Sequence, residues 1–396
     1  MKLESSDKLQ VLFLPRWYPH RYDPMFGLFV ERHGLAISSQ ADVSVLFIYG
    51  DVDLKTKTYE VIQDIGILFT TRIYYKKSKL KPALLAHLVN LYRFLWSHWI
   101  GFKQIRETGR KPDLLHVHVL TRLGMIAWLY KIFTRTPYVI TEHWSRYLDY
   151  TDGFKGFFRK KATRRVVRQS AAVSVVSHNL GAAMKKHNLN HPRYFVINNV
   201  VDTDLFRMKE QVEPPVIVNF IHVSCIEDRS KNISGLLRVV ARLQALRNDF
   251  KLTIVGTGQD MEAIRTLAKD LNLKNRHLQF TGMLEGKAIV EAYQKAQFMV
   301  MFSNYENMPV VIGEAFACGL PVLTTNVGGI SEHVNPDRGI LVSPQDEAAM
   351  LEKLTFMIDN YSDFDRRAIR KYAVEQFSTE AVAGQIEKIY SFAIQK

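Results

Sequence analysis

Two hydrophobic patterns alternate along this chain: short runs that are apolar throughout, and longer segments in which apolar residues recur every third or fourth position. Short apolar runs bounded by turn residues predict buried strands, and the longer pattern predicts amphipathic helices. Because the two patterns take turns along the whole chain, we expect an α/β fold with parallel sheets. The strands expected are residues 9–14, 43–49, 112–118, 138–143, 172–176, 194–197, 216–223, 252–255, 298–301, 322–324 and 339–342.

The longest helical pattern covers residues 81–107. The large apolar side chains near helical spacing in it are Leu84, Leu85, Leu88, Leu91, Leu95, Trp96 and Trp99. We expect this stripe to pack into the core of its own domain, with a surface that faces an acceptor or a membrane as the alternative. Residues 51–75 alternate only weakly and predict irregular hairpins. Residues 346–359 and 379–392 predict two C-terminal helices.

The chain has 396 residues, enough for two domains, and its 47% hydrophobic and 23% charged content is typical of a folded protein. Cys225 and Cys318 lie in apolar surroundings, so we expect both to be buried. Two such cysteines predict no disulfide framework and favour a reducing compartment. Residues 1–15 lack a signal-peptide pattern, and the apolar stretch 83–101 is interrupted by polar residues, so we expect a cytoplasmic protein.

The net charge is +14 and the pI is near 9.5, which indicates an anionic partner. Positive charge gathers in residues 154–168, where lysines and arginines are interleaved with phenylalanines and valines. Such a segment can lie in the headgroup region of an anionic membrane, or it can be a solvated face whose apolar side packs on its own domain; the sequence leaves both open. One basic cluster without a recognisable module does not predict a nucleic-acid-binding protein.

Residues 303–332 change from loop to helix character at Met308-Pro309. Proline is tolerated at the first helical position, so we expect Pro309 to begin a helix, with Glu306 in the loop before it and Glu314 about a turn and a half inside it. A helix N-terminus binds phosphate and carboxylates accept sugar hydroxyls, so the segment suits a nucleotide sugar. In the alternative, Glu306 caps the helix and Glu314 is solvated. The strand entry and the Gly-Gly turn that follow favour the first interpretation.

This segment resembles the signature of the retaining glycosyltransferases of family 4, which have the GT-B fold. The residues that carry the resemblance are Glu306, Glu314, Gly319, Pro321, Gly328, Gly329 and Glu332. It implies two Rossmann-like domains that face each other across a cleft: residues 1–199 for the acceptor and 200–378 for the nucleotide sugar. A C-terminal helix at about 379–396 is expected to cross back to the first domain.

The resemblance also implies roles for individual residues. Glu306 would hold hydroxyl groups of the donor sugar, and Lys231, at the start of a helix, would pair with the diphosphate. His143 is expected to face the donor, with a simple hydrogen-bonding role at a strand end as the alternative; these three form the predicted catalytic set. Where the family tends to carry an arginine this chain has Cys225, and Arg229 is the candidate replacement. The further donor contacts expected are Gly27, Arg229, Met283, Asn307, Met308, Pro309, Val310 and Val311, with Glu314 on the ribose.

No metal and no cofactor are expected, because the nucleotide sugar is a co-substrate. His116 and His118 share one face of a strand, but two histidines make a poor zinc site, so we expect them to be hydrogen-bonded strand-end side chains. The acidic triplets at 51–53 and 202–204 resemble metal-binding motifs, yet we expect neither to follow a strand at a substrate site.

The implied function is transfer of a sugar, with retention of configuration, from a UDP- or GDP-sugar to a glycan or lipid-linked acceptor in polysaccharide or glycolipid assembly (EC 2.4). The acceptor is expected at the first-domain loop that carries Arg16, Tyr18 and His20. The basic and aromatic character of that domain favours a peripheral position on the inner face of an anionic membrane. A nucleotide-sugar epimerase on the same fold is the alternative, and one sequence does not fix the sugar, the base or the acceptor.

Overall fold

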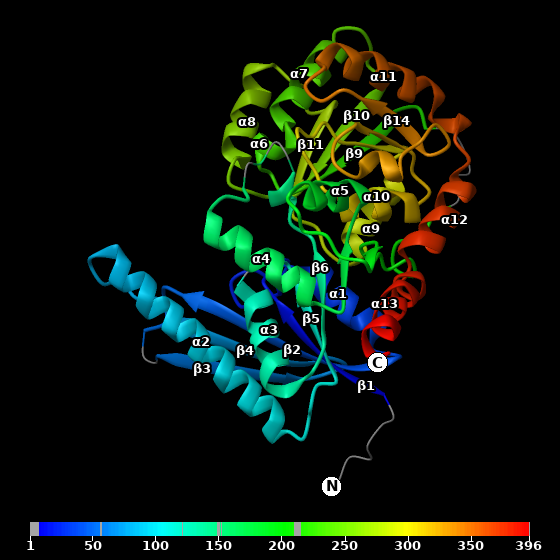
Figure 1. Cartoon of the computed structure of the whole chain (residues 1–396). Helices are drawn as coiled ribbons and strands as arrows, with labels where there is room; N and C mark the ends of the chain where they lie inside the picture. Colours follow the sequence, from blue (N-terminus) through cyan, green and yellow to red (C-terminus); the bar gives the residue numbers. More distant parts are fainter. Residues whose placement is uncertain are drawn as a thin grey trace. The chain divides into compact units, whose positions relative to one another are not determined.

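The computed structural model describes residues 8–55, 58–120, 122–148, 151, 153–209 and 215–395. Residues 1–7, part of the stretch examined for a signal peptide, lie outside this set. The chain forms two compact units (Figure 1). Unit 1 comprises Met1–Val176, Gly181–Ile197 and Val382–Lys396, and unit 2 comprises Ser177–Leu180 and Asn198–Ala381.

Unit 1 is built on an eight-stranded sheet in the order β3-β4-β2-β1-β5-β6-β7-β8. Its strands are β1 Leu9–Pro15, β2 Ala41–Asp51, β3 Tyr59–Ile65, β4 Phe69–Lys76, β5 Leu114–His118, β6 Tyr138–Glu142, β7 Ala172–Val175 and β8 Tyr194–Val196. Neighbours pair in parallel except β3 and β4, which form an antiparallel hairpin in the weakly patterned region. The central strands are buried on both faces, which explains their continuous apolar runs.

The helices of unit 1 are α1 Leu28–Ile37, α2 Ala83–Glu107, α3 Arg122–Thr134 and α4 Phe157–Gln169, while α5 His178–Lys186 and α13 Thr379–Ile394 continue into it from unit 2. Helices α2, α3 and α4 cover one face of the sheet (Figure 1). Phe102 of α2 packs on Tyr130 of α3, with ring centroids 4.7 Å apart.

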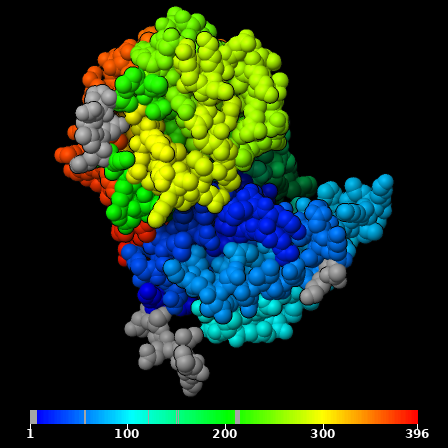
Figure 2. Space-filling view, turned by 180° about the vertical axis from the view of Figure 1, so that it is seen from behind, coloured from blue at the N-terminus to red at the C-terminus, as the bar shows by residue number. Residues whose placement is uncertain are grey.

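The expectation that α2 buries a core stripe is wrong. The seven predicted core side chains and Tyr92 are 39% to 69% exposed. The buried residues of the helix lie instead in its second half: Ser97, His98, Gly101 and Ile105. A Cβ at Gly101 would lie 2.3 Å from Leu46, so helix and sheet meet closely there. The beginning of α2 projects from the rest of unit 1 (Figures 1 and 2).

Unit 2 contains a six-stranded, fully parallel sheet in the order β11-β10-β9-β12-β13-β14. Its strands are β9 Val218–Val223, β10 Phe250–Val255, β11 Leu278–Gly282, β12 Phe298–Val300, β13 Val322–Thr325 and β14 Gly339–Val342. Its helices are α6 Asp228–Lys231, α7 Ile233–Leu243, α8 Met261–Asp270, α9 Lys287–Lys295, α10 Val310–Ala317, α11 Glu347–Asn360 and α12 Arg366–Phe377. A core of apolar side chains from β9, β10, α7 and α11 lies against this sheet.

Several local expectations for unit 2 need correction. Pro309 is the N-cap of α10 rather than its first residue, with extended backbone angles. Lys231 ends the short helix α6 instead of beginning a long one, because Asn232 takes a left-handed conformation between α6 and α7. Met283 directly follows β11. Cys225 is exposed, whereas Cys318 is buried as expected.

Asp51 is the last residue of β2, so the acidic triplet 51–53 begins at the end of a strand. Its carboxylate accepts hydrogen bonds from the Tyr22 hydroxyl at 2.7 Å and from the Asp53 N–H at 2.8 Å. Both oxygens therefore already have protein partners. Within the described part of the chain, no helix has both the length and the apolar character that crossing a membrane requires.

Candidate functional site

Glu306, in the loop between β12 and α10, forms a largely buried ion pair with Lys231 at the end of α6. Nζ of Lys231 lies 2.6 Å from Oε1 of Glu306, and the Ser303 hydroxyl donates to the same oxygen at 2.9 Å. Burial would lower the pKa of Lys231, but the facing carboxylate outweighs it and raises that pKa above its ordinary value. Lys231 is therefore a fixed positive charge at neutral pH.

The Gly328-Gly329 turn fixes the backbone on which Glu306 stands. Gly328 has a φ of +61°, and a Cβ there would lie 2.1 Å from the Glu306 carbonyl oxygen. The Gly329 N–H donates to the Asn307 carbonyl oxygen at 2.7 Å. Only glycine allows both the backbone angle and the close approach at position 328, so this part of the signature has a direct structural reason.

Helix α10 begins one residue after Pro309 and points its first N–H groups toward this loop region. The N–H groups in the first turn of a helix have no intrahelical partners, so the backbone N–H groups of Val310 and Val311 suit an anion. The N-cap residue, Pro309, has no side-chain group that could cap the helix, and Oε1 of Glu306 is engaged by Lys231 and Ser303. Glu314 is 8% exposed and accepts a hydrogen bond from the Tyr293 hydroxyl at 3.3 Å, so it is not a solvated residue either.

The other predicted donor contacts of unit 2 have different surroundings. Oδ1 of Asn307 accepts from the Ser177 hydroxyl at 2.9 Å, and the Met308 carbonyl accepts from the Asn199 amide at 2.9 Å. Met283 and Arg229 are exposed. No described contact brings the Arg229 guanidinium to the ion pair, so its role as a replacement for the family arginine stays a prediction.

In unit 1, Gly27 caps α1 with a φ of +70°, and a Cβ there would lie 2.3 Å from the Trp17 backbone, so glycine is required. Of the predicted acceptor residues, Arg16 lies over the ring of Trp144 and His20 packs among aromatic rings. Tyr18 is fully buried and reaches Glu31 with its hydroxyl at 3.3 Å. This position favours a packing role over contact with an acceptor.

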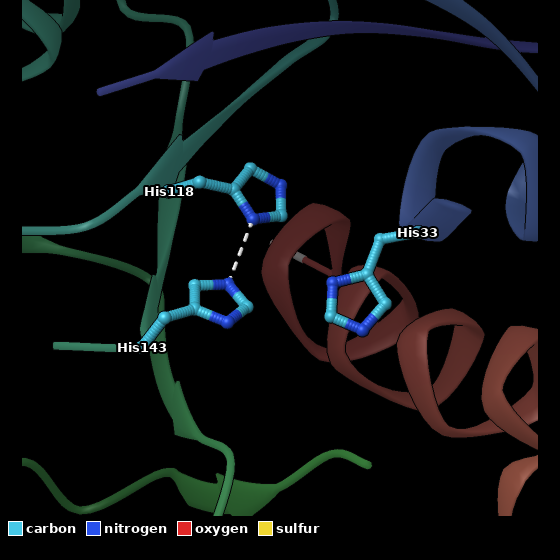
Figure 3. Close-up of side chains that lie close together, drawn as sticks. All are labelled: His33, His118 and His143. Atoms are coloured by element: carbon cyan, nitrogen blue, oxygen red, sulfur yellow. Dashed lines mark hydrogen bonds between the residues drawn. The ribbon is translucent and has the colours of Figure 1, made fainter. Parts of the chain in front are cut away.

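His143 lies within a cluster of buried histidines at the carboxyl edge of the first sheet (Figure 3). Its Nε2 is 3.2 Å from Nδ1 of His118, and the ring of His33 from α1 lies beside both. Burial, together with the neighbouring imidazoles, lowers the pKa of His118 and of His143 well below the ordinary value. His116 bonds Tyr390 and Thr141 at 2.8 and 2.6 Å, as predicted for a strand-end histidine.

Sequence reasoning missed three residues of these sites. His33 lies in α1, the helix that follows β1, less than two helical turns after Gly27. To predict that it meets His118 at the end of β5, one would have to know that β1 lies beside β5 in the sheet. Tyr293 comes from α9, and Ser177 lies far from Asn307 along the chain, so no local pattern joins either of them to the signature. Pairings of this kind depend on strand order rather than on spacing.

Two family models match this chain. Residues 209–376 match the one described as glycosyl transferases group 1, and residues 56–199 match the glycosyl transferase 4-like domain. The chain belongs to the group 1 glycosyltransferases. This glycosyltransferase is 28% identical over 345 residues to an N-acetyl-alpha-D-glucosaminyl L-malate synthase of Bacillus anthracis, covering 81% of this chain and 87% of that protein.

Other relatives and solved structures agree with this assignment. The D-inositol 3-phosphate glycosyltransferase of Corynebacterium jeikeium is 26% identical over 314 residues, covering 72% of this chain and 73% of that protein. The sucrose-phosphate synthase of Thermosynechococcus elongatus superposes with a TM-score of 0.76 at 20% identity, covering 96% of this chain and 98% of that one. Anabaena HepE, solved with UDP and glucose, superposes with a TM-score of 0.70 at 16% identity, covering 97% and 99%. The glycosyltransferase therefore has the GT-B fold, as the signature predicted.

Proposed function

We propose that this glycosyltransferase moves a sugar, with retention of configuration, from a UDP- or GDP-sugar to a glycan or lipid-linked acceptor. The observation that carries the proposal is the buried Lys231–Glu306 pair beside the start of α10. Without a donor each charge satisfies the other. A nucleotide sugar offers both new partners: a diphosphate for the lysine and hydroxyl groups for the glutamate.

The chemistry follows from those roles. The bond between sugar C1 and the diphosphate oxygen breaks, the acceptor oxygen bonds to C1 on the same face, and the acceptor proton passes to a phosphate oxygen of the leaving nucleotide. Negative charge grows on the diphosphate during this step, and Lys231 with the first N–H groups of α10 would stabilise it. Glu314 would hold the ribose. The donor contacts of Gly27 and His143 in unit 1 stay predictions, and the comparisons give no support to an epimerase.

The experiment that tests the proposal has two steps. A thermal-shift panel of UDP-, GDP- and ADP-sugars identifies the donor, and a transfer assay on the best binder then compares Glu306→Ala with the wild type. We expect kcat/KM to fall by about 100-fold or more, because a contact to the reacting sugar is lost. Glu352→Ala, on the exposed side of α11, is the control with the same change of charge. Undiminished transfer by a folded Glu306→Ala protein would contradict the proposal.

We further propose that unit 1 meets its acceptor at an anionic membrane surface. On the face that α2, α3 and α4 share, Phe157 and Phe158 are 74% and 84% exposed beside the basic residues of α4, while Val166 and Val167 of the same helix are buried in unit 1. One helix therefore has both an apolar side that packs on its own domain and an exposed basic and aromatic side. Aromatic side chains beside lysines and arginines suit the headgroup region of a bilayer.

A groove of about 240 Å³ between α3 and α4 supports this proposal. Its lining combines apolar walls with two cations: Met125, Trp128, Phe158, Lys161, Ala162 and Arg165. A phosphate on an apolar chain has the matching chemistry, because the cations can hold the phosphate while the walls contact the chain.

Co-sedimentation with vesicles tests the membrane proposal. Binding to vesicles that contain phosphatidylglycerol should fall about tenfold or more when Lys160, Lys161, Arg164 and Arg165 are replaced by Ala, since each cation near an anionic surface contributes about 1 kcal/mol. A matched control removes the same charge from unit 2, through Ala at Lys269, Lys274, Lys287 and Lys295. Equal binding by both variants would contradict a docking face on α4.

A further inference from the structure

We propose that His33, His118 and His143 together bind one divalent transition-metal ion, such as Zn²⁺. One ring nitrogen from each of the three side chains lies within 4.8 Å of those of the other two. The three come from separate elements, namely α1, the end of β5 and the residue after β6, and all belong to unit 1. Figure 3 shows the three rings gathered around a common centre.

The separation of the nitrogens suits a metal. Two bonds of about 2.0–2.1 Å at a tetrahedral angle place two zinc-bound nitrogens about 3.3 Å apart. Nδ1 of His118 and Nε2 of His143 are already 3.2 Å apart. The ligand nitrogen of His33 lies within 4.8 Å of the other two, so a shift of up to about 1.5 Å would complete a three-histidine set, which leaves the fourth position of a tetrahedral ion to water.

The surroundings of the cluster favour an ion over a simple hydrogen-bonded network. His33 and His118 are fully buried, and His143 is 9% exposed. With Nδ1 of His118 on the metal, the ring proton would lie on Nε2, which has no hydrogen-bond partner among the described residues. Phe29 and Phe13 pack on His143 and His118, with ring centroids 4.7 and 4.5 Å apart, and shield the centre.

Occupation of this site has a consequence for transfer that rests on the proposed function. His143 is a predicted donor contact, and a bound metal would hold its ring toward His33 and His118. Zinc would then lower the rate of transfer, and a chelator would restore it. The ion is thus a regulator of the same site rather than a participant in the reaction.

Metal binding is tested first without any donor. Protein freed of metal by chelation and then titrated with Zn²⁺ should bind one equivalent, and His33→Gln and His118→Gln should each weaken that binding by about 100-fold or more, since even indirect partners of a metal contribute 10–100-fold. His222→Asn is the control, because this buried histidine of unit 2 has both nitrogens bonded within its own surroundings. Binding that is equally tight in both cluster variants would overturn the proposal.

A second measurement uses the wild-type protein alone, so it holds even if a variant does not fold. X-ray absorption of the zinc-loaded protein should show imidazole nitrogens at about 2.0–2.1 Å. A shell that contains sulfur, from Cys225 or Cys318, or oxygen without imidazole would overturn the site. Transfer assays then compare the zinc inhibition of wild type and His33→Gln, each relative to its own metal-free rate. Zinc binding without inhibition would refute the regulatory role while leaving the transferase proposal intact.

Discussion

Gly328 shows how one residue without a side chain positions the charged pair of unit 2. It has a left-handed backbone, and its Cα faces the Glu306 carbonyl oxygen so closely that a Cβ would lie 2.1 Å away. Any other residue must move the loop that carries Glu306. A substitution here would therefore displace the Glu306 carboxylate without removing it.

We predict that Gly328→Ala lowers both stability and transfer. The positive φ and the clash should together reduce the free energy of unfolding by about 1–3 kcal/mol, and displacement of Glu306 should reduce kcat/KM by at least about tenfold. Gly384→Ala is the control, because a Cβ in that helical position meets nothing within 4 Å and should be neutral or stabilising. Urea unfolding and the transfer assay give both values. Normal activity of Gly328→Ala would show that the turn does not position Glu306.

For the proposed donor site, the sequence indicated candidate residues but not which of them contact one another. Glu306, Glu314 and the glycine turn could be found because the signature is local, within a single strand-loop-helix segment. The pairing of Lys231 with Glu306 spans 75 positions, and the approach of His33 to His143 depends on the order of strands in a sheet. Spacing along the chain carries no information on either.

At the scale of one element, the sequence predicted the helix α2 but not which of its faces is buried. Its helical period was read correctly, since the helix covers Ala83–Glu107. Periodicity places apolar residues on one face of a helix but does not say whether that face is covered. Here Gly101 and Ile105 face the sheet, and the larger apolar stripe faces outward.

The exposed stripe of α2 gives a prediction for membrane association. Leu88 and Trp96 are exposed, so replacing both by Asn should leave the free energy of unfolding within about 0.5 kcal/mol of wild type. If the stripe enters the headgroup region, loss of two such side chains should weaken vesicle binding by about 3 kcal/mol, roughly 100-fold. Sedimentation with vesicles measures it, with Leu246→Asn in unit 2 as the control. Self-association of the wild type that the double variant abolishes, with unchanged vesicle binding, would instead show that a second copy covers the stripe.

His98 gives α2 a dependence on pH. Burial lowers its pKa from 6.5 to about 4, and its Nδ1 bonds the Phe94 carbonyl oxygen at 2.8 Å. The unfolded chain takes up a proton at His98 between pH 6.5 and 4 while the folded chain does not. Its contribution to stability is therefore complete above pH 6.5 and is lost as the pH falls toward 4.

We predict that His98→Asn flattens the acid branch of the stability curve. Each such histidine steepens the fall by up to about 1.4 kcal/mol per pH unit. The slope of unfolding free energy between pH 6 and pH 4.5, measured with urea, should decrease by a similar amount in the variant, whatever the cost of the substitution at pH 7. An unchanged slope would mean that His98 is charged in the folded protein.

At the scale of the whole molecule, the two proposed sites differ in their use of metal. We propose that sugar transfer at the donor site needs no metal, whereas the histidine cluster of unit 1 binds one. In the proposed donor site, Lys231 and the N-terminus of α10 would neutralise the diphosphate, so we expect transfer to need no metal cation. We predict that prolonged treatment with a chelator does not lower kcat by more than about twofold; a rise would reflect removal of inhibitory zinc from the histidine cluster. A loss that added Mg²⁺ restores would contradict this prediction and would indicate a metal bridged by the donor.

Helix α13 links the order of synthesis to the order of folding. It begins in unit 2, but from Val382 onward it belongs to unit 1, where Tyr390 bonds His116 at 2.8 Å and the Phe392 carbonyl accepts from Arg193 at 2.6 Å. During translation, the residues of α13 are made long after their partners in unit 1. Tyr390 follows His116 by 274 positions, and Phe392 follows Arg193 by 199 positions. All eight strands of the first sheet are therefore translated before unit 2, while the helix that packs in unit 1 with them comes last. A nonsense codon near position 382 would thus damage the part of the protein that was made first.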